Sequence, residues 1–422
     1  MASTSLSRTP SSTGNRRTFT LSTWCKIMSS STGNFLGAGG SGDQNHIQIE
    51  SERFQIRHYA GGNDIIVNTN ALLRDPSGWY HVVCAVDTTQ STDTNRIKLY
   101  INGELQTLSD TTYPSQNYDW DFNVSGETMY ISRRGHSGAY YFNGEMSHFA
   151  WVDGQQLTPS TFGETDSTSG IWKWKEITGV TWGTNGFYLK FENSANLGLD
   201  SSGQGNNFTL SGSGTRNIDN PSINYATWNP LEPTSNLTFS NTNNTLASGA
   251  GSKGVPTTLA VSSGKFYFEN KLGSSAGNVV TGIAQDNSFT YVGSSSTSYG
   301  HWNGNIYNSG STTSYGGTAA NNDIVGIGLD LDNNKMYVSI NGTWQNSANP
   351  SSGTGGHTIN AGTYHFAASG DTSQSWSANF GNGYFGTTAI TSAGSNGNGS
   401  LFEYDVPSGY YALNTKNINT YG

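Results

Sequence analysis

Two stretches of the chain, about 240 residues apart, alternate apolar and polar residues and then run into Asn-Gly. Residues 96–105 lead into Asn102-Gly103, and residues 334–344 repeat the pattern around Asn341-Gly342. A period of two indicates a half-buried strand, and Asn-Gly favours a type I′ turn because both central residues need positive φ. Each stretch therefore predicts an antiparallel β-hairpin, with one apolar face made by Ile97, Leu99 and Ile101 and the other by Met336, Val338 and Ile340.

Further alternating runs flank both hairpins at a spacing of roughly 8–12 residues, with turn residues between them. In the first half, the predicted strands cover residues 19–27, 47–49, 54–58, 65–67, 80–87, 129–132 and 140–151. In the second half, they cover residues 265–271, 279–284, 323–331, 364–369 and 376–380. No amphipathic helix longer than two turns is predicted. The pattern predicts an all-β chain with two antiparallel β-sandwiches in series.

The turn-rich stretches divide the chain into three parts. We expect the first sandwich to occupy residues 1–165, and the second, with a C-terminal tail, to occupy residues 226–422. Residues 166–225 are predicted to be a β-rich connector with one clear strand at 186–192. A run rich in Gly, Ser, Thr and Tyr at 293–322 is predicted to be a long loop.

Charged residues make up 12% of the chain, about half the usual share, and the formal net charge is −9. The chain lacks the basic stripe that a phosphate backbone requires, so we expect no nucleic-acid partner. The N-terminal residues lack the apolar core of a signal peptide, and no apolar run approaches a membrane span in length. We therefore expect synthesis in a cytoplasm, no membrane insertion, and release by a route such as lysis.

The thiols and carboxylates give weak chemical signals. Cys25 and Cys84 lie in predicted strands, where buried free thiols or a disulfide between neighbouring strands both fit, whereas a nucleophile would need a base nearby. A retaining glycosidase needs two carboxylates about 5 Å apart. The nearest same-face pair is Glu50 and Glu52, for which we expect a solvated strand edge. We therefore expect no enzymatic activity.

Metal-ligand patterns are equally sparse. The histidines show no His-x-x-x-His spacing. Residues 330–334 resemble the start of a calcium loop, but they lack its Gly and its distal Glu, so a hairpin turn is expected there.

Aromatic residues in the predicted 293–322 loop and after the second hairpin are the best candidates for ligand binding. Sugars stack a C–H face on Trp or Tyr while polar side chains bind their hydroxyls. A Trp in a long loop is costly unless it is buried or used, so packing under the loop and recognition both stay open. The candidate residues are Tyr299, His301, Trp302, Asn303, Tyr307 and Trp344.

Segments of both halves resemble known families. Residues 19–24, 78–83, 97–103 and 141–146 resemble, in order, a laminin-G-like, concanavalin A-like jelly roll. Residues 264–269, 281–284, 323–330 and 337–342 resemble a SPRY domain, which is also a concanavalin A-like double sheet. Laminin-G-like domains sometimes hold calcium in rim loops, so the resemblance makes Asp43, Asp64 and Asp200 candidate Ca²⁺ ligands and implies no other cofactor.

The pairing of these two domains, together with residues 8–12 and 186–203, resembles virion proteins of tailed bacteriophages. The resemblance implies a non-catalytic virion surface protein, most simply part of a tail fibre or spike. Such a protein is expected to bind a host-surface glycan or protein, to contact other virion proteins, and to be oligomeric within the particle. An architectural head decoration and a glycan-cleaving enzyme stay open as alternatives.

Overall fold

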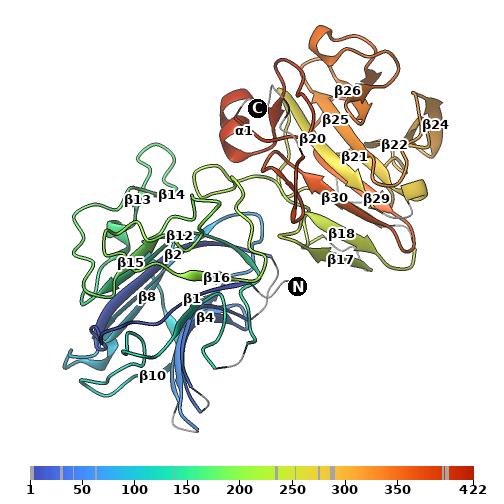
Figure 1. The fold of residues 1–422 in the computed structure, drawn as a ribbon. Helices are drawn as coiled ribbons and strands as arrows, with labels where there is room; N and C mark the ends of the chain where they lie inside the picture. Colours follow the sequence, from blue (N-terminus) through green and yellow to red (C-terminus); the bar gives the residue numbers. More distant parts are fainter. Residues whose placement is uncertain are drawn as a thin grey trace. The chain divides into compact units, whose positions relative to one another are not determined.

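The computed structural model describes residues 4–28, 32–40, 42–61, 64–136, 138–232, 236–251, 253–273, 276–285, 290–391, 394 and 399–422. The chain forms two compact units, Met1–Arg216 and Asn217–Gly422, each built from two main antiparallel sheets with a core between them (Figure 1). The predicted fold class, two antiparallel β-sandwiches in series, is confirmed.

The first unit contains sheets A and B. In the described residues, sheet A runs β10 (Leu108–Thr112), β6 (Ile65–Leu72), β5 (Arg53–Tyr59), β4 (Asp43–Glu50), β3 (Gly33–Gly40), β11 (Met129–Ile131), β1 (Ser5–Arg8) and β16 (Thr209–Ser211). Sheet B runs β15 (Phe187–Leu189), β12 (Gly144–Asp153), β2 (Thr18–Ile27), β7 (Tyr80–Asp87), β8 (Ile97–Ile101) and β9 (Glu104–Leu105).

The core of the first unit forms because alternate residues of both sheets point inward. In β2, Phe19, Leu21 and Cys25 are fully buried, and the Phe19 ring stacks on Trp151 with centroids 4.5 Å apart. Sheet A supplies the opposite wall of the same cluster with Leu36, Ile47, Ile56 and other apolar residues. Cys25 and Cys84 lie in this core as free thiols, so the free-thiol alternative is confirmed.

The second unit contains sheets C and D. Sheet C runs β17 (Leu237–Ser240), β18 (Thr245–Ser248), β30 (Ser375–Asn379), β20 (Lys265–Leu272), β25 (Ile324–Asp330), β26 (Lys335–Ile340) and β27 (Thr343–Trp344), with β28 (His357–Thr358) on β26 and β33 (Tyr411–Ala412) parallel to β20. Sheet D runs β19 (Lys253–Pro256), β29 (His365–Gly370), β21 (Val280–Ala284), β22 (Ser298–Trp302), β23 (Asn305–Asn308) and β24 (Ser311–Ser314).

The second core follows the same rule. Phe268 of sheet C and Phe366 of sheet D lie with ring centroids 4.4 Å apart. Both predicted hairpins are confirmed, with left-handed Asn102 (φ 48°) and Gly103 (φ 85°) between β8 and β9, and Asn341 and Gly342 in the same conformation between β26 and β27.

The stretch predicted as a connector contributes strands to the first unit. Residue Gly163 begins β13 (Gly163–Thr165), which pairs with β14 (Trp172–Trp174), while β15 pairs with β12 and β16 pairs with β1. Residues 155–184, which we term the strap, cover the outer face of sheet B, where Phe162 packs with Val83 and Val152. The compact first unit therefore extends to Arg216 because Phe187 and Leu189 complete its core.

The C-terminal residues cover sheet C in the same way. Residues 399–412, which we term the tail, place Phe402, Val406 and Tyr410 against Tyr267 and Tyr337 on the outer face of that sheet. The tail leads into α1 (Thr415–Tyr421), the one α-helix among the described residues. Short 3₁₀ turns lie at Asp93–Asn95, Pro159–Thr161, Ala276–Asn278 and Pro350–Ser352, and a small pair of strands comprises β31 (Tyr384–Phe385) and β32 (Thr388–Ala389).

The prediction of a long loop over 293–322 is wrong, because this stretch forms β22, β23 and β24. Its inward positions include Tyr299 and Ile306, but its other strand positions are mostly Ser, Thr, Gly and Asn. The alternation of apolar and polar residues that indicates a strand is therefore nearly absent here, while turn-forming residues are abundant, which is why the sequence predicted a loop.

Candidate functional site

The structure divides the predicted aromatic residues among three places. Tyr299 and His301 are buried and lie on the inner side of β22, in register with Ile283 and Thr281 of β21. The Tyr299 hydroxyl accepts a hydrogen bond from the Asn360 backbone N–H, as expected for a packed core tyrosine. Burial lowers the pKa of His301 to about 4, so this imidazole is neutral near pH 7.

Trp302 and Tyr307 come together on the outer face of sheet D. Their ring centroids are 6.0 Å apart, and Tyr291 extends the group with its ring 6.4 Å from Tyr307. All three side chains are half-buried, over a small apolar cluster that includes Val280 and Val292. The Trp302 indole N–H donates to the Gly277 carbonyl at 3.1 Å, which fixes the orientation of its ring. We term Tyr291, Trp302 and Tyr307 the aromatic group.

The remaining two predicted residues lie elsewhere. Asn303 occupies the left-handed turn between β22 and β23 with φ 49°. Trp344 lies in β27 of sheet C, where its ring packs beside Tyr267 under the tail with centroids 6.2 Å apart. Trp344 therefore belongs to the covered face of sheet C and not to the aromatic group.

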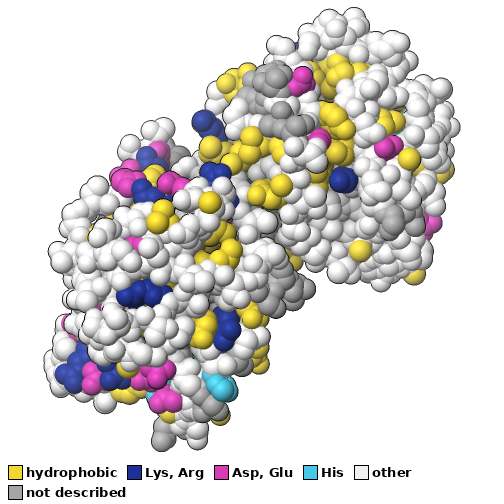
Figure 2. Space-filling view, in the orientation of Figure 1, with side chains coloured by type: hydrophobic (Ala, Val, Ile, Leu, Met, Phe, Trp, Pro, Cys, Tyr) yellow, Lys and Arg dark blue, Asp and Glu magenta, His cyan; other side chains and the backbone are white. Residues whose placement is uncertain are grey.

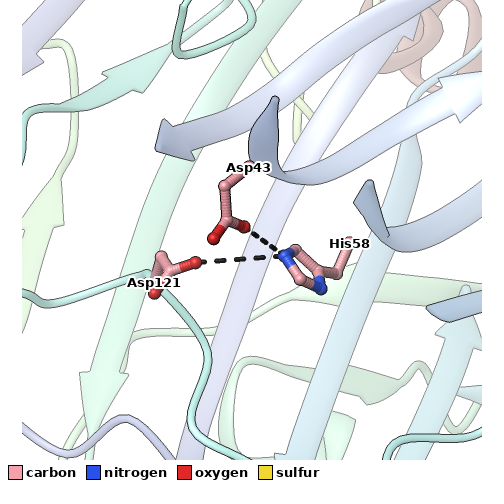
Figure 3. A group of neighbouring side chains, drawn as sticks. All are labelled: Asp43, His58 and Asp121. Atoms are coloured by element: carbon pink, nitrogen blue, oxygen red, sulfur yellow. Dashed lines mark hydrogen bonds and ion pairs between the residues drawn. The ribbon is translucent and has the colours of Figure 1, made fainter. Parts of the chain in front are cut away.

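A second candidate site is a His58-centred cluster in the first unit, which includes one of the predicted calcium ligands (Figure 3). Asp43 begins β4, and His58 lies in β5, opposite Asn45 of β4 in the sheet register. Asp121 lies in the loop between β10 and β11, held in place by its buried neighbours Trp120 and Phe122. His58 Nε2 bonds Asp43 Oδ1 and lies 4.0 Å from Asp121 Oδ2.

The other candidate calcium ligands have different surroundings. Asp64 forms an ion pair with Arg57. Asp200 closes a turn, accepting hydrogen bonds from the backbone N–H groups of Tyr188, Ser202 and Asn206. The 330–334 stretch forms the predicted turn, in which Asp330 accepts from Asn333 and pairs with Lys265 at 3.0 Å. Neither Asp64 nor Asp200 belongs to the cluster of Asp43, His58 and Asp121, which is the metal-type cluster found among the described residues.

A Ser–His pair on the outer face of sheet B was not predicted from the sequence. Ser22 Oγ and His81 Nε2 are 2.8 Å apart, and the Trp172 indole N–H of the strap donates to His81 Nδ1 at 3.0 Å. Because Nδ1 accepts, the proton of the neutral ring is on Nε2, which then donates to Ser22 and is not free to act as a base. Burial lowers the pKa of His81 to about 3. This arrangement anchors the strap and does not activate a nucleophile.

The carboxylate pair considered for glycan cleavage is separated by a turn. Ser51 and Glu52 both have left-handed φ values between β4 and β5, so Glu50 and Glu52 do not share a strand face as predicted. Glu50 lies 3.5 Å from Arg134, whereas Glu52 pairs with Arg74. Each carboxylate is thus held by a different arginine.

A polar groove lies between β1 and the turn that precedes β16. Arg8 is one of its lining residues and donates to Asn185 Oδ1 at 3.1 Å and to Asn206 Oδ1. Hydroxyl and amide groups of this kind suit the hydroxyls of a sugar, but no aromatic ring lines the groove. Its lining residues are Ser7, Arg8, Thr9, Ser11, Gly205, Asn206, Asn207 and Thr209.

Most of the chain's surface is uncharged, although charged residues gather around the His58-centred cluster. Figure 2 shows Lys, Arg, Asp and Glu in a few groups on a face that is otherwise mostly uncharged, in keeping with a charged fraction of 12%. Within the described part of the chain, no helix has the length and apolar character that crossing a membrane requires.

Comparison with known proteins places the first unit in structural context. Residues 2–161 match the family model of the concanavalin A-like lectin/glucanases superfamily, whose description includes both binding proteins and enzymes. No curated protein matches the chain.

Similar solved structures include two SPRY domains. The crystal structure of the SPRY domain of human HERC1 has 14% identity and a TM-score of 0.30, and covers 36% of this chain and 96% of that one. The TRIM65 PSpry domain has 13% identity and a TM-score of 0.28, and covers 37% of this chain and 92% of that one.

Proposed function

We propose that this protein is a non-catalytic surface protein of a tailed-phage virion, part of a tail fibre or spike, that binds a host-surface glycan. The match of residues 2–161 to a superfamily that includes lectins supports a binding role. The sparsely charged, amide- and hydroxyl-rich composition supports recognition of an uncharged polar partner. The virion assignment is supported by the resemblance of the domain pair to phage virion proteins.

The aromatic group is the observation that carries the glycan-binding proposal. Tyr291, Trp302 and Tyr307 lie edge to face on the outer face of sheet D, with 74° and 64° between neighbouring ring planes, and we propose this group as the sugar-binding platform. The hydrogen bond to Gly277 holds the indole in a fixed plane. Half-buried rings of fixed orientation can stack on the C–H face of a sugar at low entropic cost. Asn305 is the cross-strand partner of Trp302; its Nδ2 donates to the Asn303 carbonyl at 2.8 Å, and its Oδ1 can accept from a sugar hydroxyl beside the platform.

A printed glycan array probed with the full chain tests this proposal. We expect binding to at least one host-type glycan, and we expect Trp302→Ala to weaken it at least tenfold, about 1.4 kcal/mol or more. Trp344→Ala is the matched comparison because its indole is also half-buried but lies on sheet C. Loss of binding in Trp344→Ala with full binding in Trp302→Ala would place the site elsewhere and refute the platform.

Labelling of the mature particle tests the virion assignment separately. Antibody against the full chain is expected to mark tail fibres or spikes in electron micrographs. Label on the capsid faces would favour a head decoration instead, and a particle that lacks the chain would end the virion proposal. Release of reducing ends from host polysaccharide by the purified chain would show that the protein is an enzyme.

A further inference from the structure

We propose that Asp43, His58 and Asp121 form a site for one divalent transition-metal cation of the Zn²⁺ type. The inference concerns the first unit and is independent of the proposed glycan platform on sheet D. Each of the three residues offers one ligand atom, and these atoms all lie within 4.8 Å of one another. Figure 3 shows both carboxylates directed at the same imidazole nitrogen.

The spacing suits a small cation after a minor side-chain rotation. Ligand atoms bound to one Zn²⁺ at about 2.0–2.2 Å lie roughly 3–4 Å apart. His58 Nε2 and Asp121 Oδ2 are already 4.0 Å apart. The Asp43 side chain is 62% exposed and can rotate freely, whereas the His58 side chain is 9% exposed and fixed. The site thus joins a rigid nitrogen ligand to an adjustable carboxylate.

Surrounding groups orient these ligands as outer groups do in known metal sites. The Tyr118 hydroxyl lies 2.6 Å from His58 Nδ1, the nitrogen that does not face the carboxylates. If Nε2 binds the cation, Nδ1 carries the proton and donates to the Tyr118 oxygen. Asn45 donates to Asp121 Oδ2 at 3.0 Å, and Arg16 donates to Asp121 Oδ1 at 2.7 Å.

The donor set selects the class of cation. Calcium takes six to eight oxygen ligands, and a single imidazole nitrogen among two carboxylates does not supply them. Imidazole together with carboxylate suits Zn²⁺ and neighbouring first-row ions. The calcium expectation for Asp43 is therefore replaced by a transition-metal proposal.

Calorimetric titration of the untagged full chain with ZnCl₂ and CoCl₂ tests the proposal. We expect one cation per chain, and we expect Asp43→Asn to weaken binding at least about 100-fold, more than the 10- to 100-fold typical of outer groups. Tyr118→Phe is expected to weaken it by about tenfold. Asp119→Asn is the matched control, since Asp119 lies in the same loop as Asp121 but pairs with Arg17 outside the cluster.

The visible spectrum of the cobalt-loaded wild-type chain gives a second test that needs no variant. Bands of tetrahedral or five-coordinate Co²⁺ support the site, whereas the weak spectrum of hydrated octahedral Co²⁺ contradicts it. Unchanged Zn²⁺ affinity in Asp43→Asn would overturn the proposal, as would binding of CaCl₂ without binding of ZnCl₂. In the first case Asp43 and His58 form only an ion pair, and in the second the chain binds calcium instead of a transition metal.

Discussion

The two units cover the outer face of one sheet in different ways. In the first unit, the strap is anchored by a neutral aromatic stack in which the His81 ring lies between Trp24 and Trp172, with centroids 4.7 and 5.9 Å away. In the second unit, the tail is anchored on Glu269, whose side chain lies fully buried on the outer face of sheet C. The first unit therefore holds its strap with uncharged aromatic side chains, whereas the second unit holds its tail with a titratable carboxylate.

The Glu269 anchor depends on hydrogen bonds to the tail backbone. Its two carboxylate oxygens accept from the N–H groups of Glu403 and Tyr404, each at 2.9 Å, and Tyr267 and Asn379 donate from the sheet at 3.3 Å. Burial raises the pKa of Glu269 to about 7 in spite of these donors. The comparison shows that the residue that anchors a covering segment decides how the stability of the unit depends on pH. In the second unit that residue is Glu269, and in the first it is the neutral His81.

The largest effect is expected from Glu269→Ala. Removing the acceptor leaves two part-buried tail N–H groups without a partner and opens a cavity at a fully buried position, which should lower the stability of the second unit by about 4 kcal/mol. Hydrogen exchange measured by mass spectrometry on peptides of β20 and β25 reads this loss. Glu403→Ala is the control, because it keeps the backbone N–H that binds Glu269; an equal loss in this control would contradict the anchor.

A slightly smaller effect is expected from Trp172→Ala in the first unit. The substitution removes a half-buried indole and leaves His81 Nδ1 without its hydrogen-bond donor. We expect the stability of the first unit to fall by about 3 kcal/mol, measured by hydrogen exchange in β2 and β7. Trp172→Phe keeps a ring over His81 but no N–H, and should cost about 1 kcal/mol. Equal losses in the two variants would show that the hydrogen bond contributes nothing.

The pH dependence of the second unit sharpens the comparison. Since the folded-state pKa of Glu269 lies above the unfolded value, its contribution to stability is fully present below about pH 4.5 and is lost as pH rises through about 7. Between pH 5 and 7 this loss is about 2 kcal/mol. Histidines of the unfolded chain titrate near pH 6.5, within the same range, so the effect of Glu269 is measured as the difference between wild type and Glu269→Gln. A difference that stays constant from pH 5 to 7 would contradict the raised pKa.

Three histidines with lowered pKa values make the stability of the first unit depend on pH in the opposite direction. Burial lowers the pKa values of His46 and His81 to about 3 and of His148 to about 4. Their contribution is present above about pH 6.5 and is lost as pH falls toward these values. Exchange in β2 and β7 should therefore accelerate on acidification, and an exchange profile that stays flat after correction for intrinsic rates would contradict this.

Small effects are also expected at the two repeated turns. A Cβ on Gly103 would lie 2.5 Å from the Trp172 ring, and one on Gly342 would lie 2.6 Å from the Tyr404 ring. Both glycines also have left-handed φ values. Each Gly→Ala change should cost about 1–2 kcal/mol in its own unit, seen as a lower urea midpoint. Unchanged urea midpoints would show that Trp172 and Tyr404 do not pack tightly against the two turns.

The sequence revealed what depends on local pattern. The Asn-Gly turns and the inward alternation of residues such as Phe19 and Phe268 predicted both sandwiches, because periodicity is a short-range signal. Trp302 and Tyr307 were predicted together because they are close in sequence, although they were placed in a loop and not on the β22–β23 hairpin that they occupy. The strap and tail contacts escaped prediction, since nothing in the local pattern links Trp172 to His81 or Glu269 to Tyr404.

The metal-type cluster shows the same limit. Asp43 was a candidate from the resemblance alone, but its neighbours His58 and Asp121 are brought to it by the β4–β5 register and by the burial of Trp120. Such long-range placement is decided by packing and not by spacing in the sequence.

Hydrogen exchange in Glu269→Ala, compared strand by strand with wild type, tests most directly whether each unit is a separate sandwich sealed by its own segment. Faster exchange confined to the strands of Asn217–Gly422, with β2 and β7 unchanged, is the predicted result. Loss of protection spread equally over both units, or none in either, would contradict it.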